Sequence, residues 1–382
     1  MTVRASLLIV GITLLAAACE PTPTQPEDVR TLLALPDHFE TPFVPEDNPL
    51  TGAKIELGRH LFYDRRLSAN GTQACSDCHE QARAFSDGRR TPVGSTGQTL
   101  ERNSQGLGNV AYSASLTWAS ASLVHLEDQI AIPLRNDDPI ELGVTDGVVD
   151  EVLQRFAADA TYPRLFAEAF PESSSGPTMG KILLALASFC RSLISANSPY
   201  DRFLAGEPDA LTEAQRRGLT LFNGERFECF HCHGGTQFTS NYRDASDTEL
   251  RLSFFNNGLY NVGGDGSYPP YDQGLYELTF DLRHRGLFRP PNLRNVEHTA
   301  PYMHDGSLET LRDVLLHYAR GGRLIESGPL AGDGRLSPLR SGLVRGFTAT
   351  DDEIDAVVSF LESLSDPSFL ADPRYASPFA GP

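Results

Sequence analysis

The sequence has little positive charge. Its 382 residues include 32 lysines and arginines against 50 aspartates and glutamates, which gives a formal net charge of −18. Binding of nucleic acid requires clustered basic side chains that neutralise phosphates, so this balance argues against a nucleic-acid partner. Long apolar runs are also scarce, and the run at residues 7–15 is too short to cross a membrane as a helix.

That short run belongs to an export signal. Arg4 precedes it, and three alanines ending at Ala18 stand directly before Cys19. This arrangement is typical of a secretory signal peptide, so we expect residues 1–18 to be removed and the protein to act in the periplasm. Cleavage after Ala18 releases a soluble protein, whereas a lipid on Cys19 anchors it to the outer membrane. The sequence leaves both outcomes open, with residues 19–48 as a Pro/Thr-rich tether or extension.

Alternating strand patterns are missing, and the recognisable elements are helices. Apolar residues recur at helical spacing in four segments, 147–160, 179–196, 309–322 and 350–365. Glycine (33) and proline (26) are plentiful, which indicates long ordered loops between them. We therefore predict a mainly α protein.

The segment 309–322, "ETLRDVLLHYARGG", places a tyrosine on its apolar face. That face consists of Leu311, Val314, Leu315 and Tyr318. Thr310 and Asp313 form a capping box at its start, and His317 is expected beside the apolar face. If this face is buried, the hydroxyl of Tyr318 needs a partner.

Four of the six cysteines fall into two copies of one motif. "ACSDCHE" and "ECFHCHGG" both contain C-x-x-C-H, the attachment motif of c-type haem. A redox C-x-x-C pair needs no following histidine, a zinc site rarely repeats this motif so far apart, and disulfides at this spacing would be strained. We therefore predict two covalently bound haem c groups. The first haem is expected to be attached through Cys75 and Cys78, with His79 as its proximal ligand. The second is expected to be attached through Cys229 and Cys232, with His233 as its proximal ligand. His231 is expected to be a bystander, and Cys190 a buried, inert thiol.

The two halves of the chain resemble each other beyond these motifs. Both carry Gly-x-x-Leu-Phe before C-x-x-C-H and a short tag after it, which contains Phe85 or Phe238. We predict two tandem cytochrome c-like haem domains. The polar segment "LAGEPDALTEAQ" suggests the boundary, with residues 49–206 in the first domain and 207–382 in the second.

Methionine, a common axial ligand of haem iron, is also scarce. Met1 belongs to the signal peptide, Met179 starts a helical segment, and Met303 lies in a loop. An electron carrier fills both axial positions of each iron, whereas a peroxidase leaves one open. In a carrier, His60 or His125 would have to supply the ligand that the first haem lacks.

Several ordered motifs resemble the bacterial dihaem cytochrome c peroxidase/MauG family. They are "RNSQGLGNVAYSASLTW", "LEDQIAIPLRNDDPIELG" and "FRPPNLRNVEHTAPYMHDGSLETL", together with the paired C-x-x-C-H. The resemblance implies that the N-terminal haem is the peroxide site and that the C-terminal haem stores the second oxidising equivalent. It places Gln129 and Glu141 over the first haem, where the amide orients peroxide and the carboxylate moves a proton between its oxygens. Trp118 is implied between the haems as an electron relay.

The resemblance also implies further ligands. Asn103, Thr299 and Pro301 match the ligands of an inter-haem Ca²⁺, for which amide and carbonyl oxygens are suitable donors. Arg289 and Arg294 are the expected partners of the haem propionates.

Two differences distinguish this sequence from the typical peroxidases of the family. Typical peroxidases carry a histidine in the loop after the first motif that blocks the first iron, and "TPVGSTGQTLERN" contains none. Tyr318 occupies the position of their axial methionine, as a tyrosine does in MauG. A phenolate favours the ferric and higher states, whereas methionine raises the reduction potential.

These differences indicate a MauG-type enzyme, and the wider sequence resembles the MbnH-like branch. Such enzymes form a bis-Fe(IV) state with hydrogen peroxide and oxidise aromatic residues of an exported partner protein, in this branch tryptophan to kynurenine. Two alternatives remain: a peroxidase that draws electrons from a small redox protein, and a non-catalytic dihaem electron carrier.

Overall fold

The computed structural model describes residues 28–379, and the predicted signal peptide and Cys19 lie outside this range. The helices are α1 (Val29–Leu32), α2 (Gly52–Tyr63), α3 (Leu126–Arg135), α4 (Val149–Ala157), α5 (Tyr162–Ala169), α6 (Met179–Ser192), α7 (Pro199–Leu204), α8 (Glu213–Phe222), α9 (Tyr276–Thr279), α10 (Leu311–Ala319), α11 (Asp351–Glu362) and α12 (Pro367–Leu370). The strands of the described chain, β1 (Leu324–Ile325) and β2 (Gly332–Asp333), form one short antiparallel pair. The predicted mainly α class is confirmed. No helix between residues 28 and 379 is long and apolar enough to cross a membrane.

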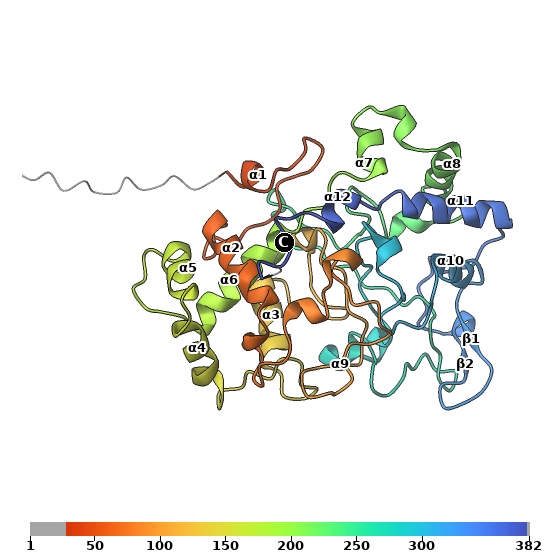
Figure 1. The fold of residues 1–382 in the computed structure, drawn as a ribbon. Helices are drawn as coiled ribbons and strands as arrows, with labels where there is room; N and C mark the ends of the chain where they lie inside the picture. The colour runs from red at the N-terminus through yellow and green to blue at the C-terminus, as the bar shows by residue number, and fades with distance from the viewer. Residues whose placement is uncertain (1–27, 380–382) are drawn as a thin grey trace, which may run out of the picture.

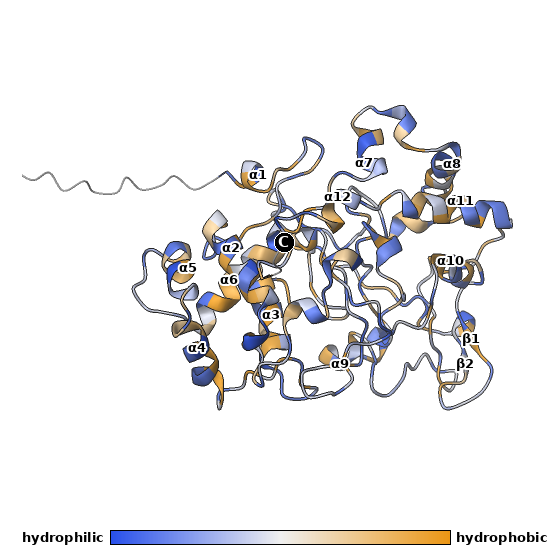
Figure 2. Ribbon diagram, in the orientation of Figure 1, coloured by the Kyte–Doolittle hydropathy of each residue, from blue (hydrophilic) through white to orange (hydrophobic). Residues whose placement is uncertain are grey.

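The two halves of the chain lie side by side (Figure 1). One half holds α2–α6 and the other α8, α10 and α11. Each half has its own apolar core, one formed mainly by residues 57–193 and the other by residues 222–364. Apolar residues gather where α2 and α6 face each other (Figure 2).

The same helix crossing builds both halves. α2 crosses α6 and α8 crosses α11, and a glycine stands at each contact. A Cβ at Gly58 would lie 2.0 Å from the carbonyl oxygen of Ala185, and one at Gly218 would lie 1.9 Å from that of Ala356. These are the glycines of the repeated Gly-x-x-Leu-Phe. The repeat therefore marks a close helix contact that a larger residue would not allow.

The predicted helices form where the sequence placed them. The four segments identified by their apolar spacing become α4, α6, α10 and α11. The Thr310–Asp313 capping box is confirmed at the start of α10, and a second box, between Thr212 and Gln215, begins α8. Capping satisfies backbone N–H groups that have no partner within the helix, so these sequence signals are reliable.

Segments from both ends of the described chain pack against the first half. Phe39 is buried with Tyr112 and Ile194, so the chain before α2 is folded onto the protein. Phe369 and Tyr375 join the first core, and the backbone carbonyl of Tyr375 accepts a hydrogen bond from the Tyr63 hydroxyl at 2.7 Å. The last described residues accordingly lie beside α2 and α6, near the label C in Figure 1.

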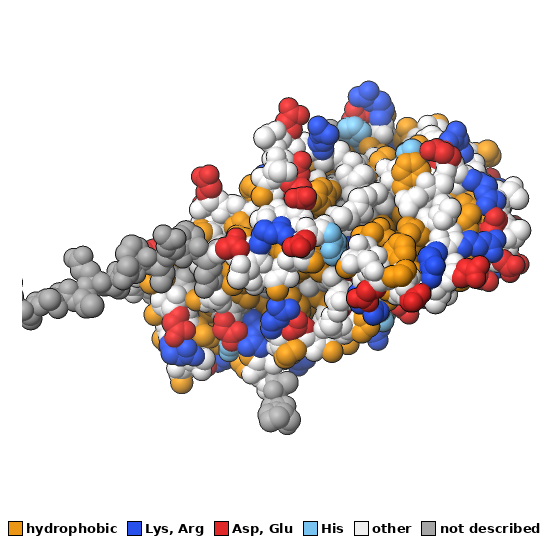
Figure 3. All heavy atoms as spheres, turned by 90° about the horizontal axis from the view of Figure 1, so that it is seen from above, with side chains coloured by type: hydrophobic (Ala, Val, Ile, Leu, Met, Phe, Trp, Pro, Cys, Tyr) orange, Lys and Arg blue, Asp and Glu red, His pale blue; other side chains and the backbone are white. Residues whose placement is uncertain are grey.

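On the face seen in Figure 3, acidic and basic side chains are interspersed with apolar ones and no basic cluster dominates.

Candidate functional site

The first pocket gathers the predicted residues of the N-terminal half. Cys75, Cys78 and His79 line it together with Gln129 of α3 and Glu141 from the loop that follows α3. The motif forms one short 3-10 turn in which the His79 N–H donates to the Cys75 carbonyl at 3.0 Å. This turn directs both thiols and the imidazole to one side of the chain.

The histidine of each motif is oriented by the backbone of the tag that follows it. Nδ1 of His79 lies 2.7 Å from the carbonyl oxygen of Phe85, and Nδ1 of His233 lies 3.0 Å from that of Phe238. Both phenylalanines have a positive φ, which turns their carbonyls towards the rings. A carbonyl oxygen can only accept a hydrogen bond, so Nδ1 must carry the proton, which leaves Nε2 free to bind a metal.

The polar groups of the first pocket suit proton transfer. Burial raises the pKa of Glu141 to about 7, so this carboxyl exchanges its proton near neutral pH. Oε1 of Gln129 is buried without a hydrogen-bond partner among the described residues, although it lines the same pocket. A buried amide oxygen without a partner calls for a ligand or water that donates to it.

In the part of the chain that the structure describes, the first pocket contains one imidazole that can bind haem iron. Among the described residues that line it, His79 is the only histidine and there is no methionine. The loop at residues 91–103 borders the pocket with Pro92 and Leu100. His60 packs against Tyr162 and Phe379, and His125 lies beside Phe43, so neither candidate for the sixth ligand of a carrier lines the pocket.

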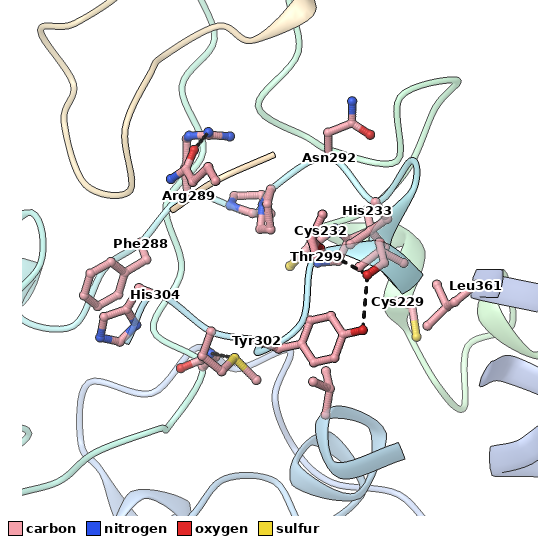
Figure 4. A pocket seen from close by; sticks show the side chains of 18 of the residues that line it. Cys229, Cys232, His233, Phe288, Arg289, Asn292, Thr299, Tyr302, His304 and Leu361 are labelled. Carbon is pink, nitrogen blue, oxygen red and sulfur yellow. Dashed lines mark hydrogen bonds between the residues drawn. The ribbon is translucent and has the colours of Figure 1, made fainter. Parts of the chain in front are cut away.

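The second pocket is lined by the C-terminal motif and by α10. Cys229, Cys232 and His233 form one wall (Figure 4). The same pocket is lined by the predicted apolar face of α10, Leu311, Val314, Leu315 and Tyr318. Burial raises the pKa of the Tyr318 hydroxyl, which also hydrogen-bonds the side chain of Asn257. The structure thus brings Tyr318 and His233 into one pocket.

The expectation for His317 was wrong. It was placed beside the buried face of α10 but is itself buried, with Nε2 2.9 Å from the carbonyl oxygen of Asn257. Desolvation lowers its pKa to about 4. The loop around Asn257 covers a second side of α10, which helical periodicity in α10 alone could not reveal.

A wall shared by the two pockets contains three of the predicted residues. Trp118, Asn103 and Arg289 line both. The indole N–H of Trp118 donates to the Asn103 carbonyl at 2.8 Å, which fixes the ring. Trp118 therefore stands between the pockets, where the resemblance implied it.

The two arginines expected near haem propionates differ in their partners. Both line the second pocket, but Arg294 makes a bidentate pair with the buried Asp201, at 2.8 and 2.9 Å. Arg289 donates to the Thr117 carbonyl and to Gln105 and has no carboxylate partner in the described chain; burial lowers its pKa to about 10. A buried cation without an acid is the better-placed partner for an anionic ligand.

The residues of the predicted calcium site lie around the shared wall. Asn103, Thr299 and Pro301 all line the second pocket. The hydroxyl of Thr299 donates to the Val296 carbonyl at 3.0 Å, and the amide nitrogen of Asn103 donates to the Arg89 carbonyl at 2.8 Å. Oxygen atoms of these residues can accept, so they suit a hard cation, but they offer no carboxylate.

The residues present fit two covalently attached haems. The five described cysteines form no disulfide, and the four thiols of the motifs line the two pockets in pairs. Burial raises the pKa of all four, to about 11 for Cys232 and about 12 for Cys78 and Cys229. Two thiols, an oriented imidazole and an unpaired buried arginine are what a haem c with its propionates requires.

Sequence reasoning missed some of the groups that shape these pockets. The carbonyls of Phe85 and Phe238 act through the backbone, so their residue type carries no signal beyond the repeat of the tag. Asn257, which contacts Tyr318, lies in a loop without a motif. Cys190, expected only as a buried thiol, also lines the first pocket.

Comparison with known proteins agrees with this geometry. The family described as di-haem cytochrome c peroxidase matches residues 52–209. Cytochrome-c peroxidase IdrP1 of Pseudomonas sp. (strain SCT) is 34% identical over 86% of this chain and 86% of its own length. Methylamine utilization protein MauG of Methylorubrum extorquens is 30% identical over 97% of this chain and 96% of its own.

A solved structure is also similar across almost the whole chain. A MauG-like protein associated with microbial copper homeostasis superposes with a TM-score of 0.89 and 46% identity, covering 91% of this chain and 99% of that one. With this likeness and the sequence relatives, the chain belongs to the dihaem cytochrome c peroxidase/MauG family of peroxide-dependent oxidoreductases.

Proposed function

We propose that this protein uses hydrogen peroxide to oxidise aromatic side chains of an exported partner protein, converting tryptophan to kynurenine. The observation that carries the proposal is Tyr318, which lines the second pocket with His233 where the peroxidases of this family are expected to offer methionine. Haem c bound at the two sites supplies reduction of peroxide and storage of the oxidising equivalents. An anionic oxygen ligand favours such storage over electron uptake from a cytochrome.

The side chains around the pockets have distinct tasks in this proposal. The paired cysteines would hold the haems, and Nε2 of His79 and of His233 would bind iron. Glu141 takes a proton from one peroxide oxygen and returns it to the other, for which a pKa of about 7 is suited. Oε1 of Gln129 accepts a hydrogen bond from peroxide, and Trp118 relays electrons between the pockets.

The structural neighbour supports a partner of a particular kind. Because that MauG-like protein is associated with copper homeostasis and is 46% identical, we propose an exported copper-handling protein as the substrate. Action in the periplasm, with or without a lipid on Cys19, is part of the same proposal.

The test is the intact mass of a candidate partner after treatment with the haem-loaded enzyme and peroxide. We expect the mass change of tryptophan converted to kynurenine, and its loss in Tyr318→Phe together with an altered ferric spectrum of one haem. Tyr302→Phe is the matched control, because Tyr302 lines the same pocket and its hydroxyl donates to the Val296 carbonyl at 3.2 Å.

Other outcomes would favour the alternatives. An unchanged partner mass with rapid oxidation of a small cytochrome would indicate a peroxidase, the function named for the IdrP1 relative. No reaction with peroxide at all would leave the electron carrier. A ferric spectrum unaltered in Tyr318→Phe would assign this tyrosine to packing alone.

A bound Ca²⁺ is a further part of the proposal. Asn103, Thr299 and Pro301 would bind it beside the wall that the pockets share. We expect chelation of calcium to change the spectra of both haems and readdition of Ca²⁺ to restore them. Magnesium should not replace it, because Mg²⁺ requires a tighter octahedral geometry.

A further inference from the structure

A row of tyrosines leads away from the second pocket. Tyr268 and Tyr260 are almost fully buried, and Tyr271 is 53% exposed. Asn257 connects the row to the pocket, because its side chain hydrogen-bonds the Tyr318 hydroxyl and its Oδ1 lies 3.4 Å from the Tyr268 hydroxyl. The rings of Tyr268 and Tyr260 are in contact, with centroids 5.4 Å apart.

A second arm joins this row to the wall between the pockets. The ring of Tyr268 packs on Phe288 and His304 at 5.8 and 6.0 Å. Those two rings stack on each other with centroids 3.7 Å apart. Figure 4 shows them next to each other. Trp118 belongs to the same apolar cluster, and its carbonyl accepts from the N–H of Arg289, the residue after Phe288. The contacts of Tyr268 therefore lead to Tyr318 through Asn257 and to Trp118 through Phe288 and its neighbour Arg289.

Tyr260 has a built-in proton acceptor. Its hydroxyl donates to Oδ2 of Asp305 at 2.5 Å, a short charge-assisted hydrogen bond. Asp305 forms an ion pair with Arg90, whose Nη2 lies 3.9 Å from the carboxylate. The Arg90 side chain is 65% exposed, so this ion pair connects Asp305 to the surface. Burial raises the pKa of Tyr260, and Asp305 raises it further, so this phenol is protonated at neutral pH.

Tyr271 brings the row to the surface. It stands three residues after Tyr268 in the same loop, and its side chain is exposed. The protein contains a single tryptophan, Trp118, which lies inside. Beyond it, tyrosines are the most readily oxidised residues on this side of the second pocket.

We infer that Tyr268, Tyr260 and Tyr271 form a relay that passes electrons from the surface towards the second pocket, with Asp305 as the proton acceptor for Tyr260. Transfer between side chains slows steeply with distance, and the contact between the rings of Tyr268 and Tyr260 replaces part of one long step by a short one. The inference rests on the proposed function only for the final electron donor, an aromatic side chain of the partner held against Tyr271.

The step balances for each electron. Tyr260 loses one electron to an oxidising equivalent derived from hydrogen peroxide, and its O–H bond breaks as the proton moves to Asp305, leaving a neutral phenoxyl radical and a carboxylic acid. An electron from the donor at the surface and the proton from Asp305 then restore Tyr260. Two such electrons, with two protons that the oxidised donor releases, convert one hydrogen peroxide to two waters.

The experiment treats the haem-loaded protein with peroxide and no partner, freezes it rapidly and records electron paramagnetic resonance. We expect a tyrosyl signal that narrows when tyrosine is ring-deuterated and that is lost in Tyr260→Phe. In Asp305→Asn the signal should form more slowly. Peptide mapping should find oxidation or cross-linking at Tyr260 or Tyr271 in the wild-type protein and neither in Tyr260→Phe.

Tyr162→Phe is the matched control. Tyr162 is as buried as Tyr260 and donates to a carboxylate, Asp64, at 2.8 Å, but it packs with Phe156 in the first core and lines neither pocket. Its loss should leave the signal unchanged. Tyr271→Phe, at an exposed position, should retain the fold and the Tyr260 signal while slowing partner oxidation.

The outcomes separate this inference from the proposed function. A tyrosyl signal that persists in Tyr260→Phe, or partner oxidation at wild-type rate in both Tyr260→Phe and Tyr271→Phe, would overturn the relay. A relay signal in a wild-type protein that changes no partner mass would support the relay and contradict the proposed function.

Discussion

The two pockets hold their histidines in the same way and face them with different side chains. In both, a helix crossing at a glycine, a 3-10 turn and a phenylalanine carbonyl position the imidazole. The first pocket then offers Glu141 and Gln129, and the second offers Tyr318. The repeated frame therefore supports the cofactor, while a few side chains outside the repeat give each pocket its own chemistry.

The largest effect is expected from a substitution that impairs the chemistry of the first pocket alone. Glu141→Gln keeps the shape but removes the proton acceptor, so we expect the reaction with peroxide to slow by about 10²–10⁴-fold, the usual contribution of a general acid–base. Stopped-flow spectroscopy measures this rate. The spectrum of the second haem should not change, and an altered one would mean that the substitution disturbs both pockets.

The pH dependence of the same reaction sharpens this prediction. Burial raises the pKa of Glu141 to about 7, so the carboxylate that accepts the peroxide proton increases as the pH rises through 7. The wild-type rate should rise over this range and level off above it, and Glu141→Gln should lack the rise. A wild-type rate that falls between pH 6 and 8, roughly one unit on either side of that pKa, would contradict a role as base.

The next comparison concerns the two arginines at the second pocket. Arg294→Met would leave the buried Asp201 with no arginine and with contacts only from Ser198 and His38, so we expect a loss of about 3–5 kcal/mol in the free energy of unfolding. Arg289→Met breaks no internal ion pair and should cost less. If Arg289 binds a propionate, its loss should instead lower the reduction potential of a haem, because a cation that favours the reduced state is gone.

Denaturation of the haem-loaded variants and spectroelectrochemical titration measure these two quantities. Equal losses of stability with unchanged potentials would assign both arginines to packing.

The sequence predicted the helices and the two C-x-x-C-H motifs that line the pockets, since these depend on local patterns. α4, α6, α10 and α11 have regular apolar spacing, and the C-x-x-C-H motifs are short and specific. It did not predict the burial of His317, which depends on a loop 60 residues away, or the pairing of Arg294 with Asp201, 93 residues away. It also did not predict that Tyr375 packs in the first core. Contacts between distant segments leave no periodic signal in either one.

The smallest expected effect tests whether the frame itself is shared. Alanine at Gly58 or at Gly218 puts a Cβ about 2 Å from a backbone oxygen of the crossing helix, so the helices must separate. We expect each substitution to lower the free energy of unfolding by about 1–3 kcal/mol, as overpacking usually does. Gly180→Ala in α6 is the control, because its Cβ would meet nothing within 4 Å. Similar losses of stability at Gly58 and Gly218 would show that the two helix crossings are equivalent. A loss at one position alone would mean that only that crossing depends on close contact between its helices.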